Sequence, residues 1–560
     1  MNTVRILAFG AVVLPVLSTA FACSKPQDPA KSRPLVVQES APLRRIRQVF
    51  ARVPEVLARN FKEFDGPSGK ISGFGAGDAY PQIWLRDSAW IVDAAGAWYS
   101  KETLTSWLDL HLAHASKEGR LRDWVAKGSA EEFREWAPHV EFKNGFAFDT
   151  NSNESDQEPS AALAYCRAEA LLGPAAPANT AARNVRVSKL IGAVNALTRD
   201  RTDTKSGLIW SGLTADWGDV SPVYPDQQAI YFDAKTPRTL SLYSNVMVYG
   251  ALKCLSTLDG PTAQQDALAE RAAQLRNLIR LAFWMKDAGF FRVRVPFDAL
   301  PTGFADDDAR FALGGNALAA LFGVADPEQA TAIFKTAERL RLAQSFSTIS
   351  TDLVPPYAAF VFQHPAMREP FRYQNGGQWD WFGAALVEAE FERGSATLAL
   401  THLNQIVSRI LHAGPGIHEW YGSDGTPEGS PAYAAAAAAL HSTIVRGLLG
   451  VTRSPNGYRV AIRTGESLLP MEILQRAAGE RLVVKQTVTE RAIEVEVESS
   501  ARISQVCTLP PPGRTADDMS ATDMALPRSL QIIGKDTLTC ADVSATARRI
   551  RVRFGISPSN

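Results

Sequence analysis

The sequence lacks a surplus of charge of either sign. Its 560 residues include 59 Lys and Arg side chains and 59 Asp and Glu side chains, without a long run of one sign. Proteins that bind nucleic acid need a basic surplus, or at least a basic stripe, to neutralise phosphates. We therefore expect no nucleic-acid partner. The hydrophobic share of 46% and the charged share of 21% are typical of a globular chain with a large core.

Cysteine is scarce, with five residues in the chain. Apart from Cys23, these residues are too few and too scattered for a disulfide framework, and none has the CxxC spacing of a zinc site. Cys507 and Cys540 both lie in a strand-like region, where export would permit a bridge. Cys166 and Cys254 lie in helical patterns, so we expect them to be buried apolar residues.

Several motifs of known chemistry are also missing. The sequence has no GxSxG nucleophile elbow, no P-loop and no HExxH zinc motif. Gly314 and Gly315 do not follow a strand-like segment, which excludes a dinucleotide fingerprint. The acidic triplet at 306–308 is interpreted as an exposed loop or a helix cap in preference to a calcium site. We expect neither a metal nor an organic cofactor.

The N-terminal segment MNTVRILAFGAVVLPVLSTAFAC has one basic residue followed by an apolar stretch of signal-peptide length. Ala20 to Ala22 form a small-x-small cleavage pattern, so residues 1–22 are predicted to be a signal peptide. Cys23 follows the cut, where a bacterial lipoprotein is acylated, and residues 23–41 would form a polar tether. This predicts a periplasmic or outer-membrane lipoprotein that meets the membrane only through its lipid. Soluble secretion is the alternative.

Residues 42–450 are dominated by a helical pattern, with apolar residues at three- and four-residue spacing. About twelve such segments alternate with loops rich in Pro, Gly, Asp and Asn. After Val451, segments such as LVVKQTVTE and AIEVEVESS alternate apolar and polar residues, as antiparallel strands do. We predict a mainly α fold, a toroid of helical hairpins, followed by a small antiparallel β domain at 451–560.

The first unusual loop, AYPQIWLRDSAWI, places Trp84, Arg86 and Asp87 directly before a helix. In a purely structural interpretation, Asp87 caps that helix. The same residues can also hold a sugar ring, because a carboxylate accepts from hydroxyls, a guanidinium donates to them, and an indole covers the apolar ring face. We favour the second interpretation because aromatic residues cluster here.

The second loop, FDTNSNESDQEPSAALAY, is crowded with acids and amides. Asn153, Glu154 and Asp156 are candidate ligands for sugar hydroxyls. A polar loop leading into a helix start is the equally favoured alternative.

The third loop contains ADWGDV, in which Asp216 and Asp219 bracket Trp217. An aromatic wall desolvates a carboxylate and raises its pKa, which suits a general acid near neutral pH. Turn or capping roles for both acids are the alternative.

The fourth loop, FRYQNGGQWDWFG, has a Gly-Gly turn that would let the backbone approach a ligand closely. A turn with core tryptophans is the alternative. The candidate ligand-binding residues are Asn375, Gly376, Gln378, Trp379 and Trp381.

The fifth stretch, IHEWYGSDGTPEGS, begins at Ile417 and shortly precedes a run of six alanines at 434–439. It places Glu419 between His418 and the aromatic pair Trp420 and Tyr421. An ionised Glu419 would activate a water molecule, and the aromatic residues would wall the site.

These loops occur in the order of a known superfamily. Over roughly residues 43–450 the chain resembles the six-hairpin, (α/α)6-barrel glycosidases, most closely the group with neutral/alkaline invertases, the amylo-1,6-glucosidase domain of glycogen debranching enzymes and, more remotely, trehalases. WLRDSAW resembles the Arg-Asp motif of the deepest sugar subsite. GDVSP…DAKTPRTLSLYSNVMVYGAL resembles the stretch in which a catalytic Asp precedes a Pro-Arg loop. YQNGGQWDWFG is similar to a Tyr-x-Asn-Gly-Gly-x-Trp segment, and HEWYGSDGTPEGSPAYAAAAAAL to the segment before the last barrel helix.

By this resemblance Asp219 is the general acid and Glu419 the general base of an inverting glycoside hydrolase. Asp216 stays a rival acid, because the Asp-Trp-Gly-Asp spacing departs from the family patterns, and His418 stands where invertases have Pro. The two carboxyls of an inverting enzyme lie about 6.5–9.5 Å apart, which leaves room for a water molecule. The expected substrate is an oligosaccharide or glycoconjugate with an α-linked glucosyl-type bond.

Two other functions stay open. A glycoside phosphorylase would use phosphate in place of the activated water and would replace the base with a basic anion pocket. A non-catalytic, surface glycan-binding lipoprotein would keep the aromatic residues without needing both acids. The oligomeric state is not predicted.

Overall fold

The computed structural model describes residues 39–66, 69–78, 80–134, 139–149, 153–173, 180–258, 260–454, 456–521, 524–525, 528–543 and 548–558. The predicted signal peptide, Cys23 and most of the predicted tether lie outside the described residues. Residues 39–560 form one compact unit. The boundary predicted between the helical and β regions stays a prediction.

Six helices contact one another in a closed cycle: α3 with α6, α6 with α8, α8 with α10, α10 with α12, α12 with α14, and α14 with α3. We call these helices the inner ring. All nine residues of α14 are buried, as expected for a helix that is apolar on every side. The inner-ring helices are α3 (Leu85–Ala95), α6 (Gln157–Leu172), α8 (Leu242–Leu255), α10 (Leu313–Phe322), α12 (Asp380–Glu392) and α14 (Ala434–Ser442).

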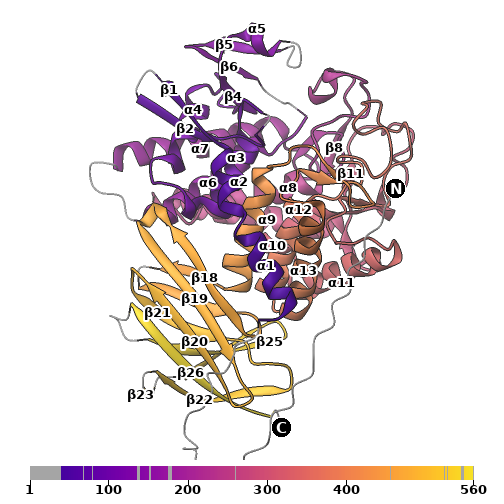
Figure 1. Ribbon diagram of the computed structural model, residues 1–560. Helices are drawn as coiled ribbons and strands as arrows, with labels where there is room; N and C mark the ends of the chain where they lie inside the picture. The colour runs from indigo at the N-terminus through magenta and orange to yellow at the C-terminus, as the bar shows by residue number, and fades with distance from the viewer. Residues whose placement is uncertain are drawn as a thin grey trace, which may run out of the picture. The chain divides into compact units, whose positions relative to one another are not determined.

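A second set of helices packs on the inner ring. α4 and α7 contact α6, α9 contacts α8, α11 contacts α10, α13 contacts α12, and α2 contacts α14. From α2 to α14, and leaving aside the short α5, outer and inner helices alternate along the chain (Figure 1). The predicted mainly helical region is confirmed. The outer helices are α1 (Ala41–Phe50), α2 (Val53–Arg59), α4 (Thr103–Ala113), α7 (Thr180–Arg201), α9 (Thr262–Phe283), α11 (Pro327–Ala343) and α13 (Ala396–Ala413), with the short α5 (Ala130–Phe133) apart from them.

Local sequence fixes several of the helix ends. At the start of α11, the Gln329 backbone N–H donates to the Asp326 carboxylate at 2.9 Å, and the Asp326 N–H donates back to Gln329 Oε1 at 3.1 Å. Pro327 occupies the first helical turn, where its missing N–H costs nothing. α10 ends at Gly323, whose φ of +86° favours glycine.

Small sheets occur in the loops of the helical region, where no strands were predicted. β3, β4, β5 and β6 form one sheet, β7, β8 and β11 form another, and β14 pairs with β15. These strands hold the loops at the N-terminal ends of inner-ring helices. Their bounds, with those of the remaining hairpins, are β1 Phe61–Gly66, β2 Gly69–Phe74, β3 Ile83–Trp84, β4 Trp124–Lys127, β5 Glu141–Lys143, β6 Phe146–Asp149, β7 Trp210–Gly212, β8 Arg238–Ser241, β9 Trp284–Met285, β10 Phe290–Phe291, β11 Arg294–Pro296, β12 Phe311–Ala312, β13 Leu353–Val354, β14 Trp420–Tyr421 and β15 Pro427–Glu428.

The C-terminal strands form two sheets, with the orders β16-β17-β21-β25-β24 and β18-β19-β20-β26-β22-β23. Every described pairing in them is antiparallel except that of β17 with β21. This confirms the predicted strands after the helical region and corrects the expectation of purely antiparallel pairing. The strands are β16 Thr452–Ser454, β17 Gly457–Ile462, β18 Leu468–Gln475, β19 Glu480–Val488, β20 Ala492–Ser499, β21 Ile503–Thr508, β22 Arg514–Ala521, β23 Met524–Ala525, β24 Arg528–Ile533, β25 Asp536–Asp542 and β26 Arg549–Pro558.

Two disulfides link the four described cysteines. Cys507 and Cys540 face each other on paired strands, with Cα atoms 4.0 Å apart. Cys166 and Cys254 are also bridged, with Cα atoms 6.1 Å apart, which corrects our expectation that they are free apolar residues. They lie on α6 and α8, which are neighbours in the inner ring, so residues 88 positions apart in sequence come within bridging distance.

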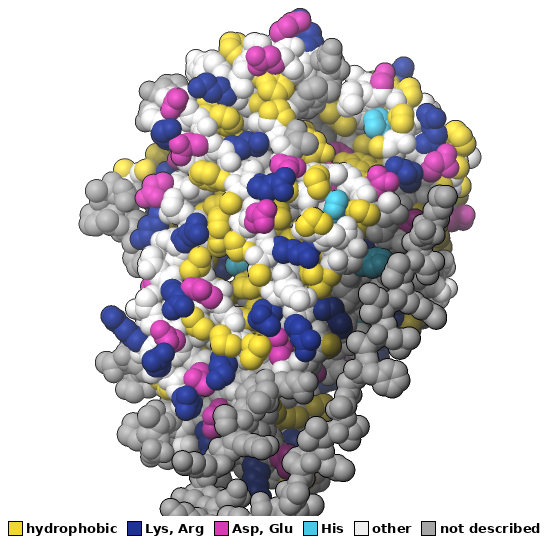
Figure 2. Space-filling model, viewed as in Figure 1, with side chains coloured by type: hydrophobic (Ala, Val, Ile, Leu, Met, Phe, Trp, Pro, Cys, Tyr) yellow, Lys and Arg dark blue, Asp and Glu magenta, His cyan; other side chains and the backbone are white. Residues whose placement is uncertain are grey.

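Lys and Arg side chains are interspersed with Asp and Glu over the face seen in Figure 2, in keeping with the balanced charge of the sequence. In the part of the chain that the structure describes, no helix combines the length and the apolar character that crossing a membrane requires.

Candidate active site

A cavity of about 510 Å³ lies at the N-terminal ends of the inner-ring helices. It receives side chains from the first turns of α3 and α12, from the residue before α14, and from the loops between them. Eight predicted site residues from four of the five quoted loops meet in its wall. These are Trp84, Arg86, Asp87, Trp217, Asp219, Trp379, Trp381 and Glu419.

Glu419 is a buried acid, with 5% of its surface exposed. Its Oε2 atom accepts from the Ser430 backbone N–H at 3.0 Å and from the Tyr80 hydroxyl at 3.2 Å. Burial raises the pKa of Glu419 to about 7, and the nearby charges of Asp87 and Asp219 act in the same direction. Glu419 is therefore ionised above about pH 7 and has donors in place that stabilise the ionised form.

Glycine is required beside this acid. Gly429 has a φ of +67°, and a Cβ atom there would lie 2.6 Å from Glu419 Oε2. The loop after β14 can therefore fold back over Glu419 only with glycine at this position.

Of the two rival acids in ADWGDV, Asp219 lines the cavity and Asp216 does not. Asp216 has a φ of +48° and directs its carboxylate to the Gly315 backbone N–H, at 3.0 Å, in the first turn of α10. Burial raises the pKa of Asp216 to about 7. Between the two, the Trp217 indole donates to the buried Asp352 at 2.7 Å. Asp216 and Trp217 thus tie down the turn that presents Asp219.

Arg86 lies at the base of the first loop, where it is ion-paired with Glu154 and Asp156. Its Nε atom lies 2.9 Å from Asp156 Oδ2, which also accepts from the Tyr243 hydroxyl at 2.9 Å. Glu154 and Asp156 were expected to contact substrate, but they do not line the cavity. They instead hold a buried guanidinium in one orientation, because it would otherwise be buried without a counter-charge.

Asp87 faces the cavity from α3 and accepts from the Tyr433 hydroxyl at 3.1 Å. Burial raises the pKa of Asp87 to about 6. Asn153, another expected ligand, is also outside the cavity wall. Its side-chain amide donates to the Asp219 backbone carbonyl at 3.1 Å, so it positions the loop of that acid.

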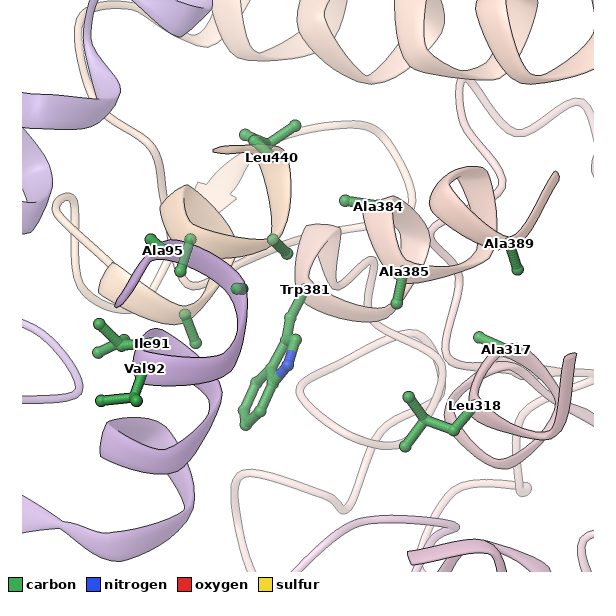
Figure 3. Packing of buried hydrophobic residues seen from close by; sticks show 14 of the residues in the cluster. Ile91, Val92, Ala95, Ala317, Leu318, Trp381, Ala384, Ala385, Ala389 and Leu440 are labelled. Atoms are coloured by element: carbon green, nitrogen blue, oxygen red, sulfur yellow. The ribbon is translucent and has the colours of Figure 1, made fainter. Parts of the chain in front are cut away.

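The aromatic wall is built from edge-to-face and tilted contacts. The ring centroids of Trp217 and Trp379 lie 4.8 Å apart, and those of Trp217 and Trp381 lie 5.6 Å apart. Trp381 reaches into the inner ring toward Leu318 of α10 (Figure 3), and its ring centroid lies 5.6 Å from that of Trp90 on α3. Trp381 therefore contributes to both the cavity and the packed core beneath it.

Six further candidates lie outside the cavity wall and support its loops. The Asn375 side chain accepts from the Tyr357 N–H at 2.8 Å, and the Gln378 amide donates to the Gly422 carbonyl at 2.7 Å. His418 and Trp420 flank Glu419 in the chain, and successive residues of an extended segment face opposite sides. The Tyr421 ring instead packs against the Arg409 guanidinium, which lies 4.0 Å from the ring centroid. These six residues are Asn375, Gly376, Gln378, His418, Trp420 and Tyr421.

The cavity also contains residues that sequence reasoning missed. Tyr80 and Gln82 belong to the quoted AYPQIWLRD stretch, and Tyr433 immediately precedes the alanine run, so adjacency to a motif was the available signal. Tyr373 and Gln374 belong to the quoted FRYQNGGQWDWFG stretch. No pattern pointed to Asp123 and His364. The missed residues are Tyr80, Gln82, Asp123, His364, Tyr373, Gln374 and Tyr433.

The acidic triplet is not an exposed loop throughout. Asp307 is buried, pairs with Arg294 at 2.7 Å, and accepts from the Tyr357 hydroxyl at 2.8 Å. Within the described residues, no group of three or more His, Cys, Asp or Glu side chains is arranged to hold a metal ion.

No family model matches the sequence, and no curated protein sequence matches it significantly. Solved structures do match. The GH63 mannosylglycerate hydrolase of Thermus thermophilus superposes with a TM-score of 0.50 at 16% identity, over 70% of this chain and all of that one.

Two rhamnosidases superpose with TM-scores of 0.54. The GH78 rhamnosidase of Bacillus sp. GL1 is 16% identical over 84% of this chain, and the Streptomyces avermitilis α-L-rhamnosidase is 11% identical over 93%. The chain shares a glycoside hydrolase fold. It spans 42% of the length of each rhamnosidase chain, and at these identities the likeness concerns the fold. The nearer resemblance to invertases and debranching domains stays a prediction.

Proposed function

We propose that the protein is a glycoside hydrolase that uses Asp219 and Glu419 as its acid and base. The observation that carries the proposal is that these two carboxyls, 200 residues apart in sequence, face one aromatic-walled cavity. The fold shared with glycosidases of two families supports it. We also propose that the closed cycle of inner helices and its outer helices form an (α/α)6 toroid.

In this mechanism Glu419 removes a proton from a water molecule, and Asp219 protonates the leaving oxygen on the opposite face of the sugar. The hydrogen bonds from Tyr80 and Ser430 favour the ionised, basic form of Glu419. Arg86 and Asp87 bind hydroxyl groups, and the tryptophans cover the apolar face of the ring. Such an enzyme inverts the anomeric configuration.

The substrate is also part of the proposal. The resemblance favours an α-linked glucosyl-type bond, while the structural neighbours are named for mannosylglycerate and rhamnose. A panel of α- and β-linked oligosaccharides and glycosides, with the anomer of the released sugar followed by NMR, identifies the substrate and tests inversion together.

Two variants test the assignment of roles. Asp219→Asn and Glu419→Gln should each reduce turnover by about 10²–10⁴-fold without changing the melting temperature. A glycosyl fluoride needs no protonation of its leaving group, so it should restore turnover in the Asp219 variant alone. Azide should rescue the variant that lacks the base. If Asp216→Asn is inactive and Asp219→Asn is active, the general acid is misassigned.

The phosphorylase alternative requires an anion pocket. Among the residues that line the cavity, Arg86 is the one Lys or Arg, and Glu154 and Asp156 already neutralise it. This composition disfavours phosphate, and phosphate-independent turnover would exclude the alternative. A glycan-binding protein without activity would show binding and no product over long incubation.

Export and lipidation at Cys23 stay part of the proposal, as does periplasmic or outer-membrane placement. Cys23→Ser should release the protein from the membrane fraction and abolish incorporation of labelled palmitate. Equal palmitate labelling of the variant would refute acylation at this cysteine.

A further inference from the structure

Two buried polar side chains, Gln82 and Asp123, lie in the cavity wall. Gln82 is 1% exposed, and neither its Oε1 nor its Nε2 atom is paired among the described residues. Asp123 is 6% exposed, and burial raises the pKa of its carboxyl. A buried amide is normally hydrogen-bonded, so the unpaired Gln82 side chain in the cavity wall marks a position where a ligand supplies the partner.

Both residues are held by the same small sheet. Gln82 directly precedes β3 and Asp123 directly precedes β4, and these strands pair antiparallel. The Leu85 N–H donates to the Asp123 backbone carbonyl at 2.7 Å, which fixes the start of β4 against α3. The two side chains are therefore presented by rigid backbone and not by a free loop tip.

We propose that Gln82 and Asp123 form a sugar-binding subsite that takes hydroxyl groups of an uncharged glycone. This inference rests on the proposed function, because it assigns substrate contacts in the same cavity. Neither residue belongs to the acid–base pair or to the Arg-Asp motif.

The hydrogen-bonding capacity of the pair matches a sugar. The Gln82 amide both donates and accepts, as a hydroxyl group does. Burial raises the pKa of Asp123 to about 8, so near neutral pH its carboxyl carries a proton and also donates as well as accepts. Each would bind a sugar hydroxyl without requiring charge on the ligand.

The charges around the cavity explain why the glycone is uncharged. Asp87, Asp219 and Glu419 all face it. Arg86 is already ion-paired, so it offers no free counter-charge. A hexuronate would place its carboxylate among these acids, which is costly in a desolvated site.

The experiment compares the wild-type protein with Gln82→Met, Asp123→Ala and Asp123→Asn. Gln82→Met keeps the side-chain volume and removes both polar groups. Asp65→Asn is the control, because it removes a carboxyl that is 80% exposed. Kinetic constants are measured on the glycoside that the panel identifies, and thermal shifts are measured with glucose, mannose, rhamnose and glucuronate.

Gln82→Met and Asp123→Ala should each lower kcat/KM by about 10–100-fold, mainly through KM, at unchanged melting temperature. Asp123→Asn should recover most of the loss, because an amide also donates and accepts. Wild-type protein should be stabilised by one of the neutral sugars and not by glucuronate.

Unchanged kcat/KM in both Gln82→Met and Asp123→Ala would overturn the subsite, and equal stabilisation by glucuronate would overturn the preference for an uncharged glycone. Failure of the hydrolase proposal looks different. In that case Asp219→Asn and Glu419→Gln leave turnover unaffected, or no glycoside is cleaved. A neutral sugar would still stabilise the wild-type protein more than the Gln82 and Asp123 variants, so the thermal shifts test the subsite independently.

Discussion

Replacing Tyr80 by Phe should move the pH dependence of the reaction. The Tyr80 hydroxyl donates to Glu419 Oε2 at 3.2 Å and so favours the ionised carboxylate, which is the form that acts as base. The pKa of Glu419 is already raised to about 7, first of all by burial. Tyr80→Phe leaves the ring in the cavity wall and removes only the donor.

The magnitude follows from the value of one hydrogen bond. A hydrogen bond to a charged group contributes about 1.5–3 kcal/mol, and one pKa unit corresponds to about 1.4 kcal/mol. The Tyr80 bond is long and only partly buried, so the lower value applies and the pKa of Glu419 should rise by about one unit. At pH 7 the ionised fraction would then fall from about a half to about a tenth, a loss of roughly five-fold in kcat/KM.

The assay is the pH profile of kcat/KM on the identified substrate. Because the protonated acid cannot act as base, activity is lost as the pH falls through the pKa of Glu419. The acid limb should therefore lie near pH 7 in the wild-type protein and about one unit higher in Tyr80→Phe, with full recovery at alkaline pH.

Ser430→Ala is the matched control, because it removes a hydroxyl and keeps the backbone N–H that donates to Glu419 at 3.0 Å. Its acid limb should stay in place. An unmoved limb in Tyr80→Phe would refute the role of this hydrogen bond. Activity that rises as the pH falls through 7 would show that Glu419 is the acid.

Three further perturbations test the structure around the site. Replacing Cys166 and Cys254 together by Ser should lower the free energy of unfolding by about 2–5 kcal/mol in denaturant titrations, because the bridge spans 88 residues. Arg86→Met should cost about 3–5 kcal/mol in the same assay, because it leaves two buried carboxylates without a counter-charge. Asp216→Asn should retain turnover. Because the pKa of Asp216 is raised to about 7, the free energy of unfolding of the wild-type protein should fall as the pH rises from about 4 to about 7. The variant should lose this fall, and urea unfolding at both ends of the pH range measures the difference.

The sequence predicts the large elements of this fold well, because long helices carry a clear periodicity and the C-terminal strands alternate. The two-residue strands β3 and β14 are too short to leave a pattern. The bridge between Cys166 and Cys254 could not be predicted either. It depends on α6 and α8 being neighbours in the ring, which is a tertiary fact.

In the site, sequence adjacency to an aromatic residue was a useful but incomplete guide. It correctly directed attention to loops that meet in the cavity, including the one with Asp219. It failed where direction mattered, since Trp420 follows Glu419 yet lies outside the cavity wall. It also missed Asp123, because a single acid before a strand has no signature until the strand is paired with β3. Burial and side-chain direction decide whether such a residue lines the cavity, and the spacing of residues in the sequence predicts neither.

The alanine run of α14 has a consequence for motion. Each of its nine residues is buried, with α3, α12 and α2 packed around it, so its amides have no route to solvent that leaves the ring closed. These amides should exchange with deuterium only through global unfolding and should be among the slowest in the protein. The ring beneath the cavity should therefore stay closed under conditions in which less buried segments already exchange.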